Sequence, residues 1–411
     1  MKRLITCIIL LFSAVIAGAQ SLKLETFVQS ALQNSPLIKD LNNQILSAQI
    51  DSVRLRAGFK PQVTASGLGL YAPVIRGYGY ANAITNGQQL TGLLTVDKQF
   101  IGKSYLNAQI LSILNQKDSL RNAIKLSEQE LRKTIIAQYI TAYGSQEQER
   151  YNREITQLLS GEEKILLKLT RSNVYKQADY LAFLVTYQQA QLQLKQAQLQ
   201  YKADYSTLKY LAGIRDTTLD SLERPNLKPG FMLDKSQSIF FRQFQLDSIR
   251  ILNQQQLVDY AYKPKLHVYM DGGYNSDLTA GFYKNWGASA GFGVTVPIYD
   301  GGQRKLLHQK IQLEEETREQ YKNFFDRQYS QQIYQLNEQI KGYDTLLEDI
   351  RNQFKYAESL IKVDAKLMQT GDLKIADLIL AVNNYLSIRN LLATNLVNQL
   401  QLINQLNYYN R

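Results

Sequence analysis

The chain has 411 residues, a formal net charge of +11, one cysteine, two histidines and seven prolines. A lone cysteine excludes an internal disulfide, and basic residues dispersed among Gln and Asn argue against nucleic acid as a partner. Beyond the N-terminus no run of about 18 apolar residues occurs, which excludes a membrane-spanning helix.

The N-terminus predicts export. Two basic residues precede an apolar run over 4–17, and the sequence AGAQ then offers a cleavage site after Ala19. Cys7 lies inside the apolar run and not at the cleavage site, so we expect no lipid attachment. We therefore interpret residues 1–19 as a signal peptide. A short membrane anchor is the alternative, disfavoured by the polar residues that follow directly.

Three weak internal matches indicate a tandem duplication. They recur in the same order at spacings of 203, 200 and 198 residues: KPQV (60–63) with KPKL (263–266), TVDKQFIG (95–102) with TVPIYDGG (295–302), and ADYL (178–181) with ADLI (376–379). A shared spacing is stronger than any single match, so the chain reads as two copies of about 200 residues.

Both copies carry the same order of elements. Repeat 1 (20–212) is expected to hold a helix over 22–56, strands at about 61–72 and 90–99, and a long helix pair over 104–212. Residues 213–238 contain Pro225, Pro229 and Gly230 and predict an irregular linker. Repeat 2 (239–411) repeats the pattern with a helix over about 239–260, strands at about 265–274 and 287–298, and a helix pair over 303–408.

The helices are predicted to be long because breakers are missing. No proline occurs between Pro73 and Pro225 or after Pro297, and these gaps are rich in Gln, Leu and Ala. The last helix carries an apolar stripe at steps of three or four residues, typical of coiled-coil packing. Its members are Leu378, Ala381, Tyr385, Ile388, Leu392, Leu396, Leu400, Ile403 and Leu406.

The strands alternate as membrane strands do. Leu266, Val268 and Met270 share one face, whereas His267 and Asp271 share the other, and aromatic residues flank the turns. Ten-residue strands with one apolar and one polar face fit a membrane barrel with a wet lumen. An ordinary soluble hairpin beneath a helix is the alternative.

Two hairpins supply four strands, and four cannot close a barrel. An open sheet edge in lipid is prohibitive, so several chains would have to share one barrel. Three chains would give 3 × 4 = 12 strands, although the residues alone require an oligomer without fixing three.

The chain resembles the TolC-type outer-membrane efflux family over essentially the whole mature sequence. The resemblance rests on the duplication and on four stretches: ALQNSPLI (31–38), GFKPQV (58–63), VPIYDGG (296–302) and QTGDLKIADLILA (369–381). It implies a mainly α protein with a β-barrel part: a homotrimer whose 12-stranded outer-membrane barrel continues as a periplasmic α-helical barrel, closed at the far tip.

The resemblance also implies a function without catalysis. Such proteins are passive exit ducts of tripartite efflux or type I secretion systems. They lie in outer-membrane lipid and dock with a periplasmic adaptor (membrane fusion) protein and an energised inner-membrane transporter. The alternative from another class is a periplasmic or surface coiled-coil interaction protein without a pore.

The resemblance places a candidate gate at the helix breaks. Asp377 occupies the family's first acidic tip position, whereas Leu380 stands at the second and Leu373 at a basic one. Asp372 and Lys374 could replace the missing charges, and Asp179 is the counterpart of Asp377 in the first copy. The competing interpretation is that Asp377 simply caps the last helix.

A second candidate feature is the corner from strand to helix. Pro297 is expected to end strand pairing, and Gly301 and Gly302 to supply the freedom for the turn. Gly102 marks the corresponding corner in the first copy, which lacks the proline.

Catalytic and metal sites are not predicted. GASAG (287–291) matches a nucleophile-elbow pattern, but Ser289 continues into an alternating strand instead of a helix. His267 and His308 lie 41 residues apart, and the acidic run 313–319 reads as a solvated helix face. We expect no catalytic residue, metal or cofactor.

Overall fold

The computed structural model describes residues 23–81, 87–230, 234–279 and 281–410. The expected signal peptide, its cleavage site and Cys7 lie outside the described residues. None of the described helices combines the length and the apolar character needed to cross a membrane.

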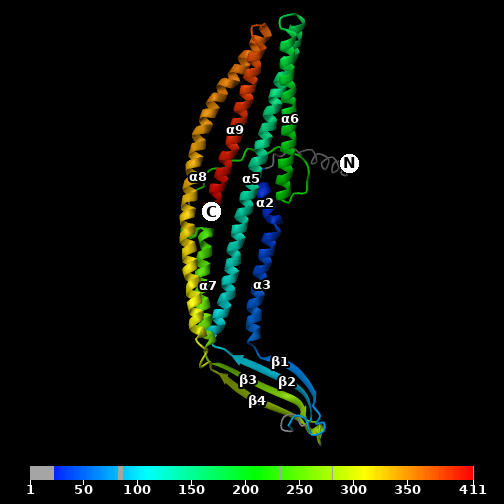
Figure 1. The fold of residues 1–411 in the computed structure, drawn as a ribbon, viewed down its shortest axis with the longest axis vertical. Helices are drawn as coiled ribbons and strands as arrows, with labels where there is room; N and C mark the ends of the chain where they lie inside the picture. The colour runs from blue at the N-terminus through cyan, green and yellow to red at the C-terminus, as the bar shows by residue number, and fades with distance from the viewer. Residues whose placement is uncertain (1–22, 82–86, 231–233, 280, 411) are drawn as a thin grey trace, which may run out of the picture. The chain divides into compact units, whose positions relative to one another are not determined.

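The chain is mainly helical, and in each half a helical segment is followed by two strands and two long helices (Figure 1). The first half has α2 (Leu24–Asn34), α3 (Pro36–Gly58), β1 (Gln62–Tyr71), β2 (Gln88–Phe100), α5 (Lys103–Arg171) and α6 (Gln177–Leu211). The second half has α7 (Ile239–Ala261), β3 (Lys265–Ser276), β4 (Trp286–Thr295), α8 (Gln303–Thr370) and α9 (Ile375–Tyr409), with short 3₁₀ turns at Lys235–Gln237 and Phe282–Lys284.

The chain divides into two compact units. Unit 1 comprises Met1–Lys39, Lys125–Ile239 and Phe325–Arg411, and so holds α2, α6, α9 and the C-terminal parts of α5 and α8. Unit 2 comprises Asp40–Ile124 and Phe240–Phe324, and holds all four strands together with α7.

The core of unit 1 lies between four packed helices, α5, α6, α8 and α9. Its largest cluster joins Leu159 and Leu166 of α5 with Phe183 of α6, Met368 of α8 and Val382 of α9, all fully buried. The apolar stripe predicted on the last helix is confirmed, because seven of its nine members are buried and the other two, Leu392 and Leu396, are half-buried. Burial of such stripes against one another drives the packing of long helices.

A second cluster in unit 1 fastens α2 and the linker to the long helices. Phe27 of α2 packs edge-on against Tyr139 and Tyr205, with ring centroids 5.8 and 6.3 Å apart. The Tyr139 hydroxyl donates to the carbonyl of Glu223 at 2.8 Å, which ties the linker to α5.

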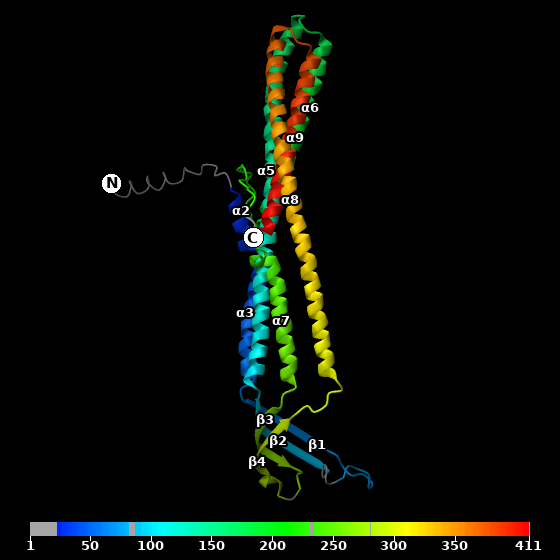
Figure 2. The same cartoon turned by 90° about the vertical axis from the view of Figure 1, so that its left-hand side faces the viewer.

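Unit 2 contains one antiparallel sheet (Figure 2), in which the strands follow the order β1-β2-β3-β4. The two hairpins are joined by pairing of β2 with β3, in which Val96 lies opposite Met270 and Asp97 opposite Tyr269. The sheet therefore combines strands from both repeats, and β1 and β4 are its two open edges.

The expected single helix over 22–56 is wrong, because α2 and α3 are separate helices. Pro36 lacks a backbone N–H and would break the hydrogen-bond ladder of a continuous helix, but it fits the first turn of a new one. Ser35 stands at the break, and its hydroxyl accepts a hydrogen bond from the Ile38 amide at 3.4 Å.

The strand expected over 287–298 is too long at its end. It stops at Thr295, which pairs with Lys265, the first residue of β3. No residue of β3 is left to pair with 296–298, and Pro297 could not donate to the ladder in any case. Strands β2 and β3 extend one or two residues beyond their predicted limits, to Gln88 and Phe100 in β2 and to Ser276 in β3, whereas β1 is one residue shorter than predicted at each end.

Candidate functional site

The helix breaks that carry the candidate gate are two turns of the same design. In the α5–α6 turn, the amides of Asn173 and Val174 donate to the carbonyls of Thr170 and Leu169. In the α8–α9 turn, Gly371 and Asp372 donate in the same way, 198 residues later, to Met368 and Leu367. Asn173 and Gly371 both adopt a positive φ, 58° and 82°. Each helix thus ends in a Schellman motif, whose left-handed residue is usually Gly or Asn.

The two turns lie at the same end of unit 1 and contact each other (Figure 1). A Cβ on Gly371 would come within 2.8 Å of a Val174 methyl group, so Gly371 allows a close approach as well as the turn. The buried Tyr175 donates its hydroxyl to the Met368 carbonyl at 3.2 Å.

Asp377 is the third residue of α9, and the competing interpretation that it caps this helix as the N-cap residue is wrong. Lys374 holds the cap position, and the Asp377 amide donates to its carbonyl at 2.9 Å. Asp179 occupies the same position in α6, where its carboxylate accepts a hydrogen bond from the Lys176 amide at 3.2 Å. An acidic residue in the first helical turn is favoured by the helix dipole.

The other candidate gate residues lie around the second turn. Asp372, Lys374 and Asp377 are exposed, and none of them forms an ion pair within the part of the chain that the structure describes. Leu373 packs against the apolar core, whereas Leu380 is exposed. The tip of a single chain therefore presents a solvated set of charges.

Sequence reasoning missed a buried carboxylate behind this surface. Asp364 of α8 is 6% exposed, and burial, reinforced by the charge of Asp377, raises the pKa of its carboxyl group. Its position three residues after Ile361 and four before Met368 belongs to the apolar stripe. An acidic residue at a core position was the signal that could have revealed it.

A second buried acidic residue in unit 1 is Glu162 of α5. Burial raises the pKa of its carboxyl group, and a hydrogen bond from Gln369 of α8 acts in the opposite direction. One of its carboxylate oxygens has no hydrogen-bond partner among the described residues.

The strand-to-helix corner of the second copy is built around a capping carboxylate. Gly301 and Gly302 both adopt positive φ, 67° and 85°. The two carboxylate oxygens of Asp300 accept hydrogen bonds from the amides of Gly302 at 2.8 Å and Arg304 at 2.7 Å. These amides hold the pKa of Asp300 below its usual range. Asp300 is thus the cap of α8 that the motif analysis overlooked, although an acidic residue just before a helix is a known start signal.

A polar network fastens the start of α8 to the end of α7. Asp259 accepts hydrogen bonds from the Arg304 guanidinium at 2.7 Å and lies 3.0 Å from the His308 Nε2 atom. Its pKa is lowered by these two neighbours, Arg304 first. The Tyr262 hydroxyl hydrogen-bonds the Asp300 carboxylate, so the capping residue Asp300 is also bonded to the segment that follows α7.

The corner of the first copy is simpler. Gly102 has no positive φ, and its carbonyl accepts hydrogen bonds from the amides of Tyr105 and Leu106. The Lys98 ammonium donates to the carbonyl of Phe59 and secures the strand against the end of α3. At the Asp300 position this copy has Phe100, so the two corners of one chain differ in chemistry.

Neither candidate for catalysis assembles a site. Ser289 lies in β4 and donates its hydroxyl to the Asp271 carboxylate of β3 at 2.8 Å, a cross-strand pair. His308 belongs to the corner network. The described residues contain no group of three or more His, Cys, Asp or Glu that could hold a metal ion.

Replacing Asp364 tests whether its buried carboxylate lowers the stability of the fold when it is charged. Because burial raises the pKa of Asp364, the folded chain holds this proton more tightly than the unfolded chain does. The charged form therefore lowers stability above that pKa, and the cost vanishes as pH falls below the ordinary value of 3.8. Asp364→Asn should raise the thermal midpoint by about 1–2 °C at pH 8 and leave it unchanged at about pH 3, measured by circular dichroism. Asp372→Asn, at an exposed site, is the matched control; equal effects at both pH values would contradict the assignment.

The two corners offer a matched pair of glycine substitutions. Neither Gly301 nor Gly102 has an atom within 4 Å of an added Cβ, so only the backbone conformation distinguishes them. Gly301→Ala should lower the free energy of unfolding by about 1 kcal/mol, because a non-Gly residue is strained at positive φ. Gly102→Ala should change it by less than about 0.5 kcal/mol. Urea titration followed by far-UV circular dichroism measures both, and comparable losses would refute the asymmetry.

Comparisons with known proteins identify the fold. No family model matches the chain, and no curated protein matches it significantly. Solved structures do: VceC from Vibrio cholerae, an outer membrane protein, superposes with a TM-score of 0.74 at 12% identity, covering 94% of this chain and 96% of that one. The MtrE outer membrane channel of Neisseria gonorrhoeae gives 0.73 at 12% identity, with 94% and 88% covered. The CmeC outer membrane channel of Campylobacter jejuni gives 0.71 at 12%, with 94% and 85% covered. The chain has the fold of the TolC-type outer-membrane channels.

Proposed function

We propose that the protein is an outer-membrane exit duct, a passive channel of a tripartite efflux or type I secretion system. One observation carries the proposal. The fold of outer-membrane channels extends over 94% of the chain and includes a four-stranded sheet with two open edges.

The faces of this sheet support a lipid-exposed barrel wall. One face presents Val96, Met270, Phe292 and Val294, and the side chains of Phe292 and Val294 are 77% and 59% exposed in the single chain. An apolar face this exposed on one protomer suits contact with lipid. The other face carries Asp97 and the Asp271–Ser289 pair, which suits a water-filled lumen.

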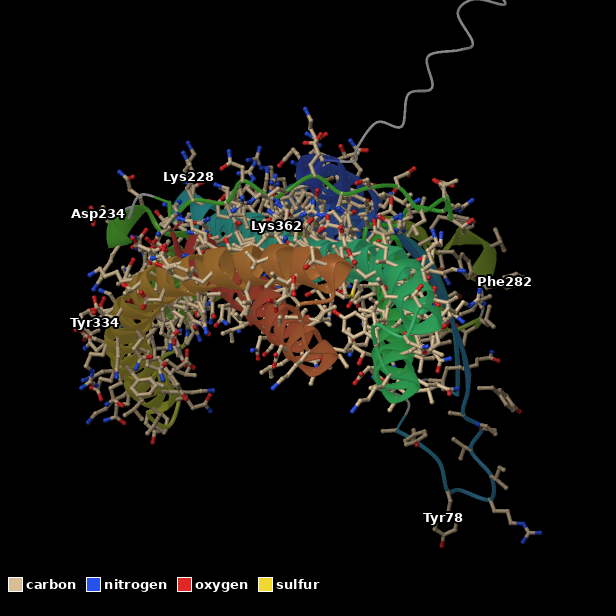
Figure 3. All side chains as sticks on the ribbon, turned by 90° about the horizontal axis from the view of Figure 1, so that it is seen from above. Tyr78, Lys228, Asp234, Phe282, Tyr334 and Lys362 are labelled. Carbon is tan, nitrogen blue, oxygen red and sulfur yellow. The ribbon has the colours of Figure 1, made fainter. Side chains whose placement is uncertain are left out.

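Aromatic residues gather at the turns of the two hairpins. Tyr78 is 85% exposed in the β1–β2 connection, and Figure 3 shows its side chain at the outer end of that loop. Phe282 and Tyr283 are exposed in the β3–β4 connection, and Trp286 is exposed at the start of β4. Aromatic rings at such positions suit the boundary between lipid and water.

The open edges support an oligomer. The outward backbone groups of β1 and β4 have no strand partner among the described residues of one chain, and leaving them unpaired in lipid would cost several kcal/mol per group. In the proposed homotrimer, β4 of each copy pairs with β1 of the next and closes a 12-stranded barrel. The paired long helices then form the periplasmic tunnel.

A passive duct has no energy source of its own, so the proposed function requires two partner proteins. An inner-membrane transporter supplies the energy and selects the cargo, and a periplasmic adaptor bridges it to the helical part. The alternative, a coiled-coil interaction protein without a pore, gives no reason for two hairpins joined in one sheet.

Cell fractionation tests the oligomer and its location together. The protein is expected in the outer-membrane fraction, as a band of three copies of a chain of 47.0 kDa or slightly less after export, converting to monomer on heating. Analytical ultracentrifugation in detergent provides an independent mass. A soluble periplasmic monomer would refute the duct.

Conductance through the purified channel tests the gate. Asp377 is exposed at the tip, so three symmetry-related copies around a constriction would attract cations. Asp377→Ala should reduce cation selectivity and weaken block by divalent cations several-fold, because the local negative charge is lost. Asp179→Ala, the same change at the equivalent position of the first repeat, shows whether the effect is specific to the second turn. Unchanged selectivity and unchanged block in Asp377→Ala would remove this residue from the gate.

A further inference from the structure

A cavity of about 360 Å³ lies in unit 1 between α5 and α9, beside the linker that follows α6. One wall is apolar and comes from α9: Leu392, Ala393, Leu396 and Val397. The opposite wall is the turn of α5 that carries Tyr143, Glu147 and Tyr151. Cavities of this size, apolar with a few placed polar groups, are typical of sites for small ligands.

The close approach of α5 and α9 at this level depends on Gly144. A Cβ on Gly144 would come within 2.5 Å of a Val397 methyl group. The glycine thus lets the two helices approach closely beside the cavity, which both Gly144 and Val397 line.

Among the described residues that line the cavity, the only carboxylate already has its charge balanced. Glu147 is 7% exposed and accepts hydrogen bonds from the Arg150 guanidinium at 2.5 Å and the Tyr151 hydroxyl at 2.8 Å. Its negative charge is therefore balanced within its own helix and leaves no attraction for a cation.

Two further guanidinium groups line the cavity without such a partner. Arg224 comes from the linker and Arg351 from α8, and neither forms an ion pair with a carboxylate of the described residues. Counting Arg150 and Glu147, the lining carries three positive charges and one negative charge, 3 − 1 = +2.

The linker holds Arg224 in place over the cavity. The Leu222 amide donates to the Gln146 side chain at 2.7 Å, and Gln146 donates back to the Leu222 carbonyl at 3.0 Å. Further along the linker, the Lys228 carbonyl accepts a hydrogen bond from Asn407 of α9 at 2.9 Å, and Figure 3 labels Lys228. The linker is thus hydrogen-bonded to both helices that bound the cavity, and these contacts position Arg224.

We propose that this cavity binds a small anionic amphiphile, with its apolar group against α9 and its carboxylate or phosphate head between Arg224 and Arg351. Guanidinium groups hydrogen-bond both kinds of head in a bidentate manner. The apolar wall would bind the short chain by burying it. The proposal does not rest on the duct function, since the site lies within one chain.

Ligand-observed saturation-transfer NMR on the full-length protein in a neutral maltoside detergent tests the site. Hexanoate and hexyl phosphate are the probes, because short chains partition weakly into micelles; hexanol and hexylammonium carry the same chain without the anion. Both anions should bind saturably and the other two should not, and the tighter of the anions identifies the head group.

The double variant Arg224→Gln/Arg351→Gln should weaken binding of both anions about tenfold or more, because the anionic head group loses its hydrogen bonds to the two guanidinium groups. The matched control is Lys195→Gln/Lys202→Gln. It removes two positive charges from a separate cavity of about 530 Å³ beside α6 and should leave binding unchanged.

Two results would overturn the proposal. One is equal binding of hexanoate and hexyl phosphate by the wild-type protein and the arginine double variant. The other is a lack of binding by the wild-type protein together with a weaker oligomer in the double variant, which would assign the arginines to a neighbouring copy.

Discussion

The backbone groups at the two open edges of the sheet are the constraint on which the rest of the account depends. A four-stranded sheet in water can leave its edges to solvent, but a sheet in lipid cannot. β1 and β4 are edges in the single chain, and the apolar face between them is exposed. Pairing of β4 with β1 of another copy would pair these edges and close the sheet, which is why the proposed duct needs several chains.

Each chain has two hairpins and two helix pairs, and its two halves are alike at the tip turns but differ at the strand-to-helix corners. The tip turns have kept the same hydrogen bonds and the same left-handed residue, Asn173 or Gly371. The corners have not: only the second has the Asp300 cap and the Asp259–Arg304 fastening. A trimer of such chains would be a ring of six similar but unequal helix pairs, in which the second corner is the more tightly held.

Patterns within one element were readable from the sequence, whereas contacts between distant elements were not. Alternation in 266–271 predicts a strand, and the spacing of Leu378 to Leu406 predicts the buried face of α9, because both depend on local periodicity. Pro36 interrupts the first helix by an equally local rule that the sequence interpretation overlooked. The capping role of Asp300 could also have been predicted, because an acidic residue just before a helix is a local signal. The pairing of Asp259 with Arg304 depends on how α7 meets α8, and the burial of Asp364 beside Asp377 depends on how α8 meets α9. No single-helix pattern contains that information.

Disulfide trapping across the proposed junction tests the central claim most directly. Cys7 is the one cysteine and lies in the expected signal peptide, so an exported chain offers a clean background. Single cysteines would be placed in β1 around Ser66 and in β4 around Ala290, and pairs at successive registers oxidised in the outer membrane. The account predicts that at least one register gives a covalent ladder ending at three chains, abolished by removing either cysteine. A strictly monomeric product at every register, or a ladder that ends at another number, would contradict it.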